Sequence, residues 1–211
     1  MMNAMPNTML IYDDACPMCK GYTRAFKHLK WSDRRAFSEL PAEFLDKLDL
    51  DRARHEIPLL DLESGEVRYG LDSQIAVLSK GLPILAPVLK WPIIKFALMP
   101  VYGLITYNRR IIAGTRPPAR GFDCAPDFHL PWRIAYLCIA GAAILLAGTL
   151  PLLLIAAALG IFFLAASRST EPFSLAGNAI TVTLLGATLA FFLPDLLVGV
   201  IIGIELYRRF A

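Results

Sequence analysis

Two cysteines with a CxxC spacing are the residues of this chain whose types and positions most clearly suggest chemistry. Cys16 and Cys19 lie in IYDDACPMCK, where they bracket a proline and a methionine. Such a pair can bind a soft metal ion, form a structural disulfide, or cycle between dithiol and disulfide. In a reducing compartment a CxxC pair is more often catalytic or metal-binding than structural. The surrounding sequence has to decide among these uses.

Charge is distributed unevenly along the 211 residues. Of the 21 Lys and Arg and 18 Asp and Glu, only six lie after Arg133. The first part therefore has the composition of a soluble domain and the last part that of a membrane region. A net charge of +3, without a basic run interleaved with aromatic residues, argues against a nucleic-acid partner. MMNAMPNTMLIYDDACP lacks the basic and apolar regions of a secretory signal, so we expect the thiols on the side where the chain is made.

The elements that must position the cysteines alternate between strands and helices. Met9–Tyr12 is an apolar strand, and apolar residues at helical spacing then predict a helix from about Pro17 to Trp31. Arg34–Leu40 is a weaker strand, and AEFLDKL is a short helix. The cysteines thus fall between a strand and the start of a helix.

Two further strands and a closing helix follow. IPLLDLESGEVRYG contains two strand-like runs joined by a turn at Gly65. Asp72 or Ser73 is expected to cap a last helix that ends at Gly81. The predicted order is β-α-β-(α)-β-β-α.

This order, with a CxxC at the start of the first helix, resembles the thioredoxin fold. The segment EIPLLDLESGEV is similar to the thioredoxin and glutaredoxin segment whose proline is cis and faces the active cysteines. The resemblance therefore implies a cis peptide bond at Pro58, beside the site. The alternative is that Pro58 only begins a strand.

More specifically, YDDACPMC and the downstream YNRRIIAG resemble the DCC family of thiol-disulfide oxidoreductases. The aspartate and two cysteines for which that family is named match Asp13, Cys16 and Cys19. Asp14 stands where family members usually have glycine, and the resemblance covers roughly Met9–Gly114. It implies a thiol-disulfide oxidoreductase that acts on a protein or small-molecule thiol or disulfide.

The residue types suit that chemistry. Cys16 is expected at a helix N-terminus, where backbone N–H groups and the helix dipole stabilise a thiolate. Pro17 fits the first helical turn, because its missing N–H costs nothing there. Cys19 would attack the mixed disulfide and release the substrate. We expect Asp13 to accept or relay the proton of Cys19, the alternative being an Asx-turn residue or a helix cap.

A metal-binding module is the competing interpretation. Two thiolates beside a membrane anchor could handle copper or mercury, without redox turnover. A closed zinc site would need two more ligands, for which Cys124 and His129 are distant candidates. His28 and His55 are expected at the surface or with ordinary partners. The favoured reading needs no metal and no other cofactor.

The two remaining cysteines, Cys124 and Cys138, lie in the second half of the chain. Cys124 lies in the Pro-rich RPPARGFDCAPDFHLPWR and could be a third redox thiol that exchanges with the CxxC pair. Its alternative is a solvent-exposed or half-buried lone thiol. Cys138 lies in an apolar run and is expected to be a small residue facing lipid or another helix.

The chain after the last strand is predicted to contact lipid. The segment 81–110 is apolar but broken by four prolines and two lysines, so we expect short, partly amphipathic helices on a membrane surface or against the redox unit. Two apolar blocks, Ile134–Ser167 and Phe173–Tyr207, are each interrupted near their midpoints, at Gly148–Pro151 and at Leu193–Asp195. We expect four short transmembrane helices, with two kinked ones as the alternative.

Basic residues predict the orientation. Five arginines are expected to flank the spans on the side of both termini, and with four spans a sixth, Arg168, joins them; neither midpoint turn has a Lys or Arg. The positive-inside rule then places the thiol domain in the cytoplasm. The five are Arg116, Arg120, Arg133, Arg208 and Arg209.

We therefore expect an α/β thioredoxin-like domain followed by an all-α membrane region. The predicted parts are a tail (1–8), a redox core (9–80), Pro-rich apolar helices and a linker (81–130), and transmembrane helices (131–211). The predicted protein is a thiol-disulfide oxidoreductase anchored in the cytoplasmic membrane. Besides its substrate, its expected partners are the lipid bilayer and a membrane protein docked on the anchor.

Overall fold

The computed structural model describes residues 7–114, 124, 126–147 and 172–210. These residues form two compact units. The sheet unit contains the chain up to Tyr107 together with Thr115–Asp127, and the helical unit contains Asn108–Gly114 with Phe128–Ala211.

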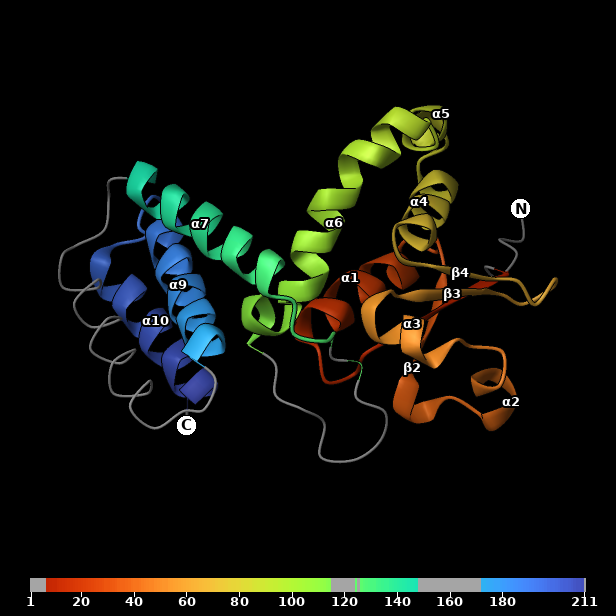
Figure 1. Cartoon of the computed structure of the whole chain (residues 1–211), viewed down its shortest axis with the longest axis horizontal. Coiled ribbons are helices and arrows are strands. Elements are labelled where there is room, and N and C mark those ends of the chain that lie inside the picture. The colour runs from red at the N-terminus through yellow and green to blue at the C-terminus, as the bar shows by residue number, and fades with distance from the viewer. Residues whose placement is uncertain (1–6, 115–123, 125, 148–171, 211) are drawn as a thin grey trace. The chain divides into compact units, whose positions relative to one another are not determined.

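A four-stranded mixed sheet forms the centre of the sheet unit (Figure 1). The strand order is β2-β1-β3-β4; β1 pairs with β2 in parallel, and the β1–β3 and β3–β4 pairs are antiparallel. This confirms the mixed α/β sheet predicted from the sequence. The strands are β1 (Thr8–Tyr12), β2 (Asp33–Ala36), β3 (Pro58–Asp61) and β4 (Val67–Tyr69).

Alternate residues of β1 enter two different cores, because successive side chains of a strand point to opposite faces. Leu10 packs with Ile57, Leu59 and Val77, and with the aromatic residues of the first helix. Its neighbours Met9 and Ile11 belong to the second core, which contains residues from the 37–53 segment. The helices of the unit are α1 (Pro17–His28), α2 (Ala42–Leu45), α3 (Leu50–His55) and α4 (Gly70–Gly81).

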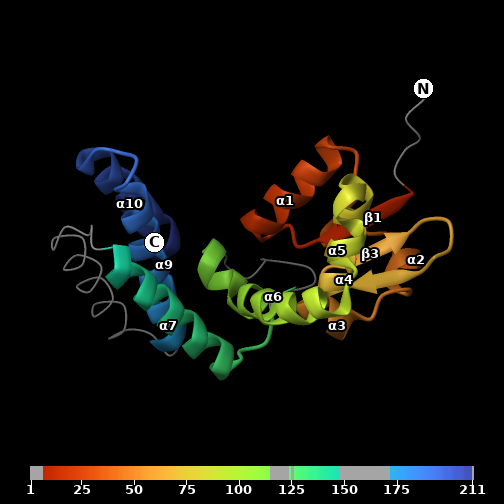
Figure 2. The ribbon, with the colours of Figure 1, turned by 90° about the horizontal axis from the view of Figure 1, so that it is seen from above.

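The first helix ends three residues earlier than predicted. Lys30 adopts a left-handed backbone conformation with φ 60°, which ends α1 at His28. Trp31 then turns back, and its ring stacks on that of Phe26 with 5.6 Å between the centroids. Figures 1 and 2 show α1 as a straight helix beginning just after β1.

The closing helix begins earlier than predicted and ends where predicted. Neither Asp72 nor Ser73 is the N-cap of α4, because the helix starts at Gly70, whose φ of +63° suits the turn from β4. Ser73 Oγ instead donates a hydrogen bond to the Arg68 carbonyl at 2.6 Å. Gly81 is the last helical residue, as expected.

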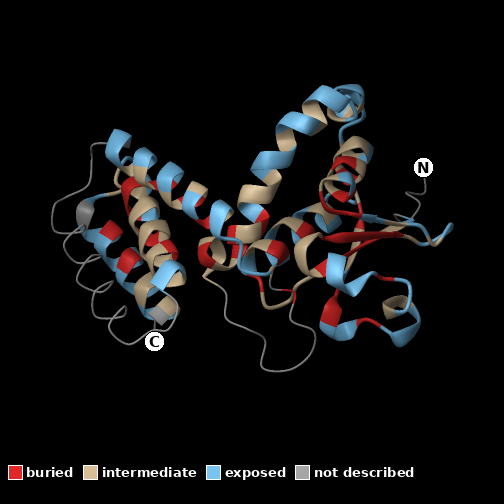
Figure 3. Cartoon of the chain, in the orientation of Figure 1, coloured by how far each residue is buried: buried red, intermediate tan, exposed pale blue. Residues whose placement is uncertain are grey.

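The segment after α4 is more helical than predicted. A 3₁₀ turn (Pro83–Leu85) and the short α5 (Ala86–Leu89) lead to α6 (Pro92–Ala113), a single helix of 22 residues. The expectation of several short helices is wrong for α6: Pro92 lies in its first turn, and Pro100 is accommodated inside it. Figure 3 shows α5 and the first half of α6 largely exposed, whereas the central strands are buried.

In the described part of the helical unit, three long helices account for most residues: α7 (Leu130–Ala147), α9 (Pro172–Leu189) and α10 (Asp195–Phe210). Of these helices, α9 packs against both α7 and α10 (Figures 1 and 2). A Cβ at Gly186 would lie 3.3 Å from Ile202, so this glycine permits the close approach of α9 and α10. The break predicted at Leu193–Asp195 is confirmed, since α9 ends before it and α10 begins at its end.

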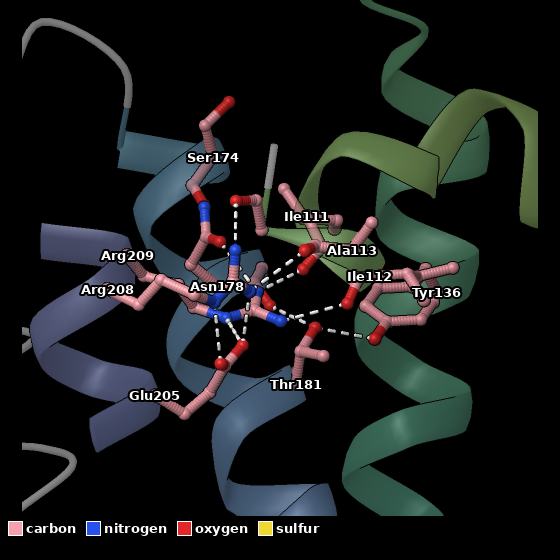
Figure 4. Close-up of polar contacts among 12 residues, drawn as sticks. Ile111, Ile112, Ala113, Tyr136, Ser174, Asn178, Thr181, Glu205, Arg208 and Arg209 are labelled. Carbon is pink, nitrogen blue, oxygen red and sulfur yellow. Dashed lines mark hydrogen bonds and ion pairs between the residues drawn. The ribbon is translucent and has the colours of Figure 1, made fainter. Parts of the chain in front are cut away.

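Arg208 and Arg209 cap the C-terminus of α6 (Figure 4). Arg209 donates to the carbonyls of Ile111 and Ile112, and Arg208 to those of Ala113 and Gly114. Glu205 accepts hydrogen bonds from both arginines. These two arginines, predicted only to orient the chain, therefore also satisfy carbonyls that a helix end leaves without backbone partners.

Among the described residues, one helix is long and apolar enough to cross a membrane by itself. That helix is α9, with a mean hydropathy of 1.3, while the apolar stretch Leu130–Leu146 of α7 falls just short of the required length. The segment Pro83–Leu89 and α6 reach the same threshold only as a pair, which is bent by 86°. The number of spans stays a prediction. The predicted break at 148–151 and Arg116, Arg120 and Arg168 lie outside the described residues.

Candidate functional site

Cys16 is the N-cap residue of α1. Its backbone is extended (φ −93°, ψ 111°), and its sulfur accepts the backbone N–H of Cys19 at 3.4 Å. N-cap positions usually carry Ser, Thr, Asp or Asn, whose oxygens accept this same hydrogen bond. A thiolate at Cys16 would thus face N–H groups and the positive end of the helix dipole. Pro17 occupies the first helical turn, as predicted.

Cys19 lies in the first turn of α1, where a side chain of the same helix binds its carbonyl. Its carbonyl accepts a hydrogen bond from Thr23 Oγ1 at 2.6 Å, and both residues are buried. They are the buried residues of α1, whereas Leu29, which follows the last residue of the helix, is 51% exposed. Helical spacing from Cys19 could have identified Thr23, which lies four residues further on.

Arg34 connects β2 to this first turn. Its Nη1 donates to the carbonyl of Lys20 at 2.9 Å and to Thr23 Oγ1 at 3.2 Å. The guanidinium carbon also lies 4.7 Å from the ring centroid of Tyr12, the last residue of β1. The Arg34 guanidinium therefore contacts both the strand that precedes the CxxC motif and the helix that follows it. No local pattern in the sequence marks Arg34 for this position.

Asp13 shapes the loop between β1 and α1. Its Oδ1 accepts the backbone N–H of Ala15 at 2.9 Å, and its carbonyl accepts that of Cys16 at 3.2 Å. This is the Asx-turn arrangement that was the alternative to a proton-relay role. Asp13 thus helps to place Cys16 at the helix start. Asp14, at the position of the family's usual glycine, accepts a hydrogen bond from Ser38 at 2.9 Å.

Pro58 has a trans peptide bond, so the expected cis bond is wrong: the described residues include no cis peptide. Pro58 is buried and begins β3, where it faces Tyr69 of β4. A strand's first residue tolerates proline, which needs no ladder donor there. The antiparallel register, with Leu59 opposite Leu10, places Pro58 at the end of the sheet from which β1 leads to the cysteines.

Both thiols are almost inaccessible. Cys16 is 1% and Cys19 4% exposed, and all four cysteines of the chain are thiols rather than disulfides. A disulfide substrate therefore reaches Cys16 only if the groups around it move. Burial also protects the thiols from unspecific oxidation, which follows thiolate character and exposure.

Cys124 is 2% exposed and packs in the core beneath the sheet with Met9, Ile11 and Leu60. The expectation of an exposed or half-buried thiol is therefore wrong, and a redox role for Cys124 stays a prediction. Cys138 on α7 is exposed, in keeping with a side chain that faces lipid.

Metal ligands do not gather in the described part of the chain: no three His, Cys, Asp or Glu side chains lie close enough to hold an ion. His55, expected at the surface or with ordinary partners, has a side chain that is 26% exposed, and its Nε2 lies 3.4 Å from a carboxylate oxygen of Asp127.

Comparison with known proteins identifies one family. The family model described as "DCC1-like thiol-disulfide oxidoreductase" matches residues 10–115, which include Asp13, both cysteines of the pair and Pro58. Comparisons with curated proteins and with solved structures gave no match.

Proposed function

Because the chain belongs to the DCC1-like thiol-disulfide oxidoreductase family, we propose that it is a membrane-anchored enzyme whose redox centre is Cys16 and Cys19, facing the cytoplasm. The family supports a redox activity on thiols or disulfides. The observation that carries the assignment to this pair is the hydrogen bond from Cys19 N–H to the Cys16 sulfur, which makes the first thiol the cap of α1.

The proposed reaction has two exchange steps. The Cys16 thiolate attacks one sulfur of a substrate disulfide, forming a mixed disulfide and releasing the other substrate sulfur as a thiolate that takes up a proton. Cys19 loses its proton and attacks the Cys16 sulfur. The Cys16–Cys19 disulfide forms and the second substrate thiol leaves, so two electrons pass from the enzyme to the substrate. The reverse sequence oxidises a substrate dithiol.

The geometry supports this division of labour. Cys16 is at the helix terminus, where the dipole favours a thiolate, and Cys19 is at the third helical position. We assign to Asp13 the relay of the Cys19 proton, in addition to its turn contacts, since it lies in the same loop. Pro58 is proposed to line the substrate side of the pair from the neighbouring strand.

A thioredoxin-like domain is the proposed frame for this site. The strand order β2-β1-β3-β4, the CxxC at the start of the first helix and Pro58 at the same end of the sheet support it. The trans bond at Pro58 is the departure from that pattern.

The proposed anchor consists of the apolar helices of the helical unit. The helix α9 supports it by length and hydropathy, and the exposed Leu145 and Leu146 of α7 suit a lipid contact. The cytoplasmic orientation rests on the arginines near the ends of the apolar blocks. In this orientation the pair works in a reducing compartment, which favours reduction or exchange over oxidation of secreted proteins.

A trapping experiment tests the redox function. Cys19→Ser should accumulate a mixed disulfide with substrate, because the resolving thiol is gone. Cys16→Ser should trap almost none. A non-reducing gel of the two variants, with a double variant as the blank, measures the adduct.

The soft-metal alternative predicts a different pattern. A two-thiolate site loses one ligand in either variant, so both should bind copper(I) more weakly by similar factors. If both variants lose copper(I) affinity equally and neither traps an adduct, the oxidoreductase assignment is overturned.

Orientation is tested by labelling from outside intact cells. In a Cys138→Ala background, a cysteine at Phe192, which is exposed between α9 and α10, should react with an impermeant thiol reagent. A cysteine at the exposed Lys30 of the sheet unit should not. The opposite result would place the redox domain outside the cytoplasm.

A further inference from the structure

An apolar surface runs over the sheet unit from residue 82 to residue 105, and we call it the 82–105 surface. Ile84 is 91% exposed, Phe96 81% and Ile93 62%, values normally found for polar side chains. A monomeric soluble protein rarely exposes a contiguous apolar patch larger than a few hundred Å². In Figure 3 this part of α5 and α6 is drawn mostly as exposed. Its large exposed side chains are Leu82, Ile84, Leu85, Val88, Trp91, Ile93, Phe96, Met99, Val101 and Ile105.

The charged residues along this segment of the chain are all basic. Between Asp72 and Asp123 the chain has no acidic residue and seven basic ones. Lys80 and Lys90 are exposed, and Lys95 forms an ion pair with Asp72 at 2.7 Å while its side chain stays 41% exposed. Basic residues around an apolar surface complement an anionic headgroup layer, because their stems contact apolar groups while their ammonium groups stay in the polar layer.

The shape of the segment argues against a simple transmembrane passage. The 3₁₀ turn with α5 and the helix α6 meet at an angle of 86°, with Lys90, Trp91 and Pro92 at the corner. Two lysines inside the run would be costly at the centre of a bilayer. Tryptophan, by contrast, is enriched at the boundary between water and lipid. The corner thus has the composition of an interface.

We propose that the 82–105 surface docks the sheet unit onto the face of a bilayer that contains anionic lipid. The contact is separate from the anchor formed by the helical unit, and it does not depend on the thiol chemistry. The two sources of attraction are burial of the exposed apolar side chains at the acyl boundary and contact of Lys80, Lys90 and Lys95 with headgroup phosphates. Docking would hold the dithiol within roughly 40 Å of the lipid, the width of a domain of this size. Thiols and disulfides at the membrane surface would then be its nearest substrates.

Quenching of Trp91 tests the proposal on the full chain. Trp31 and Trp132 are replaced by Phe, leaving Trp91 as the reporter, and the chain is reconstituted in vesicles of phosphatidylcholine with or without phosphatidylglycerol. The lipids carry bromine either near the headgroup or near the end of the acyl chain. We expect strong quenching by the headgroup-proximal bromines in the anionic vesicles and weak quenching by the deep ones.

Three kinds of variant assign the effect. Ile84→Glu with Phe96→Glu should abolish shallow quenching and expose Trp91 to aqueous acrylamide. Leu62→Glu changes an exposed leucine (48%) in the β3–β4 turn and should leave both signals unchanged. Replacing Lys80, Lys90 or Lys95 by Gln should lower the docking constant in anionic vesicles by roughly fivefold per lysine.

Three other outcomes of the quenching experiment would contradict the proposal. Protection from acrylamide without quenching by either lipid would mean that the chain itself or a second copy covers the surface. Strongest quenching by the deep bromines would mean a membrane span. Equal quenching in neutral and anionic vesicles would show that the lysines gain nothing from anionic headgroups. None of these results depends on the trapping experiment, so the proposed redox function can fail or hold separately.

Discussion

The sulfur of Cys16 accepts the backbone N–H of Cys19 at 3.4 Å, so the first thiol of the pair is also the cap of the helix that carries the second. A helix cap stabilises by about 1 kcal/mol, and a charged acceptor strengthens it. In the proposed reaction Cys16 ceases to be a thiolate when the disulfide forms, so the charged acceptor is lost. The cap therefore favours the dithiol state, and an effect of about 1 kcal/mol corresponds to roughly 20 mV in the reduction potential.

Substitution of Cys16 should separate its capping role from its chemistry. Cys16→Ser keeps an N-cap acceptor, while Cys16→Ala loses it. We expect the serine variant to be more stable than the alanine variant by about 1 kcal/mol. Neither should exchange disulfides. Urea unfolding of the reduced full chain in detergent measures the difference, and equal stability of the two variants would show that the sulfur does not act as a cap.

Thr23 should influence the resolving step. Thr23→Val removes the hydroxyl that donates to the Cys19 carbonyl and accepts from Arg34, but keeps its shape. The loss of a buried hydrogen bond costs about 1 kcal/mol, so misplacement of Cys19 should slow resolution of the mixed disulfide by about fivefold. Samples quenched with acid at successive times and run on a non-reducing gel give the rate at which the mixed disulfide disappears. Thr23→Ser, which keeps the hydroxyl, should resolve at the wild-type rate; a slow serine variant would assign the effect to packing.

Gly81 and Gly21 should respond oppositely to alanine. A Cβ at Gly81 would lie 2.0 Å from the Trp31 ring, whereas nothing lies within 4 Å of a Cβ at Gly21. Gly81→Ala should therefore destabilise the sheet unit by about 1–3 kcal/mol through overpacking. Gly21→Ala should stabilise α1 by about 0.5–1 kcal/mol, because alanine is the better helix former. Thermal unfolding followed by circular dichroism measures both.

Trp31→Leu makes room for the new methyl group and should reduce the cost of Gly81→Ala. A double-mutant cycle with no coupling between the two positions would contradict the predicted overlap.

Asp33 should make the stability of the folded protein depend on pH in the acid range. Its burial acts to raise the carboxyl pKa, but hydrogen bonds from the Lys27 ammonium (2.9 Å) and the Arg34 N–H (2.8 Å), with the charges of Lys27 and Arg35, hold the pKa below its ordinary value of 3.8. The folded state thus binds this proton more weakly than the unfolded state. The stabilisation is present above the ordinary value and is lost as pH falls through the lower, folded one.

Asp33→Asn is expected to cost about 0.5 kcal/mol at neutral pH, the size typical of a half-exposed ion pair. The difference from wild type should shrink to zero at pH values below the folded pKa. Urea unfolding at a series of pH values measures it, and Lys27→Gln should show part of the same loss. A difference that stays constant down to acid pH would exclude the carboxylate as its source.

The sequence by itself determined the features that depend on neighbouring residues. The strand before Asp13, the helix that begins at Pro17, the turn at Gly65 and the end of α4 at Gly81 follow from short-range patterning and backbone preferences. The four strands and their mixed arrangement were predictable from the element order. The family was predictable because its motif is also local, in YDDACPMC.

Only the tertiary structure decided which distant residues meet. Cys124 enters the core against Met9, and Arg34 reaches the first turn of α1 from another strand. Arg209 caps a helix that ends almost a hundred positions earlier. The trans bond at Pro58 and the end of α1 at His28 likewise depend on how the chain packs. Such contacts have no signal in local spacing, since a buried thiol or a capping arginine is selected by the groups that the fold brings to it.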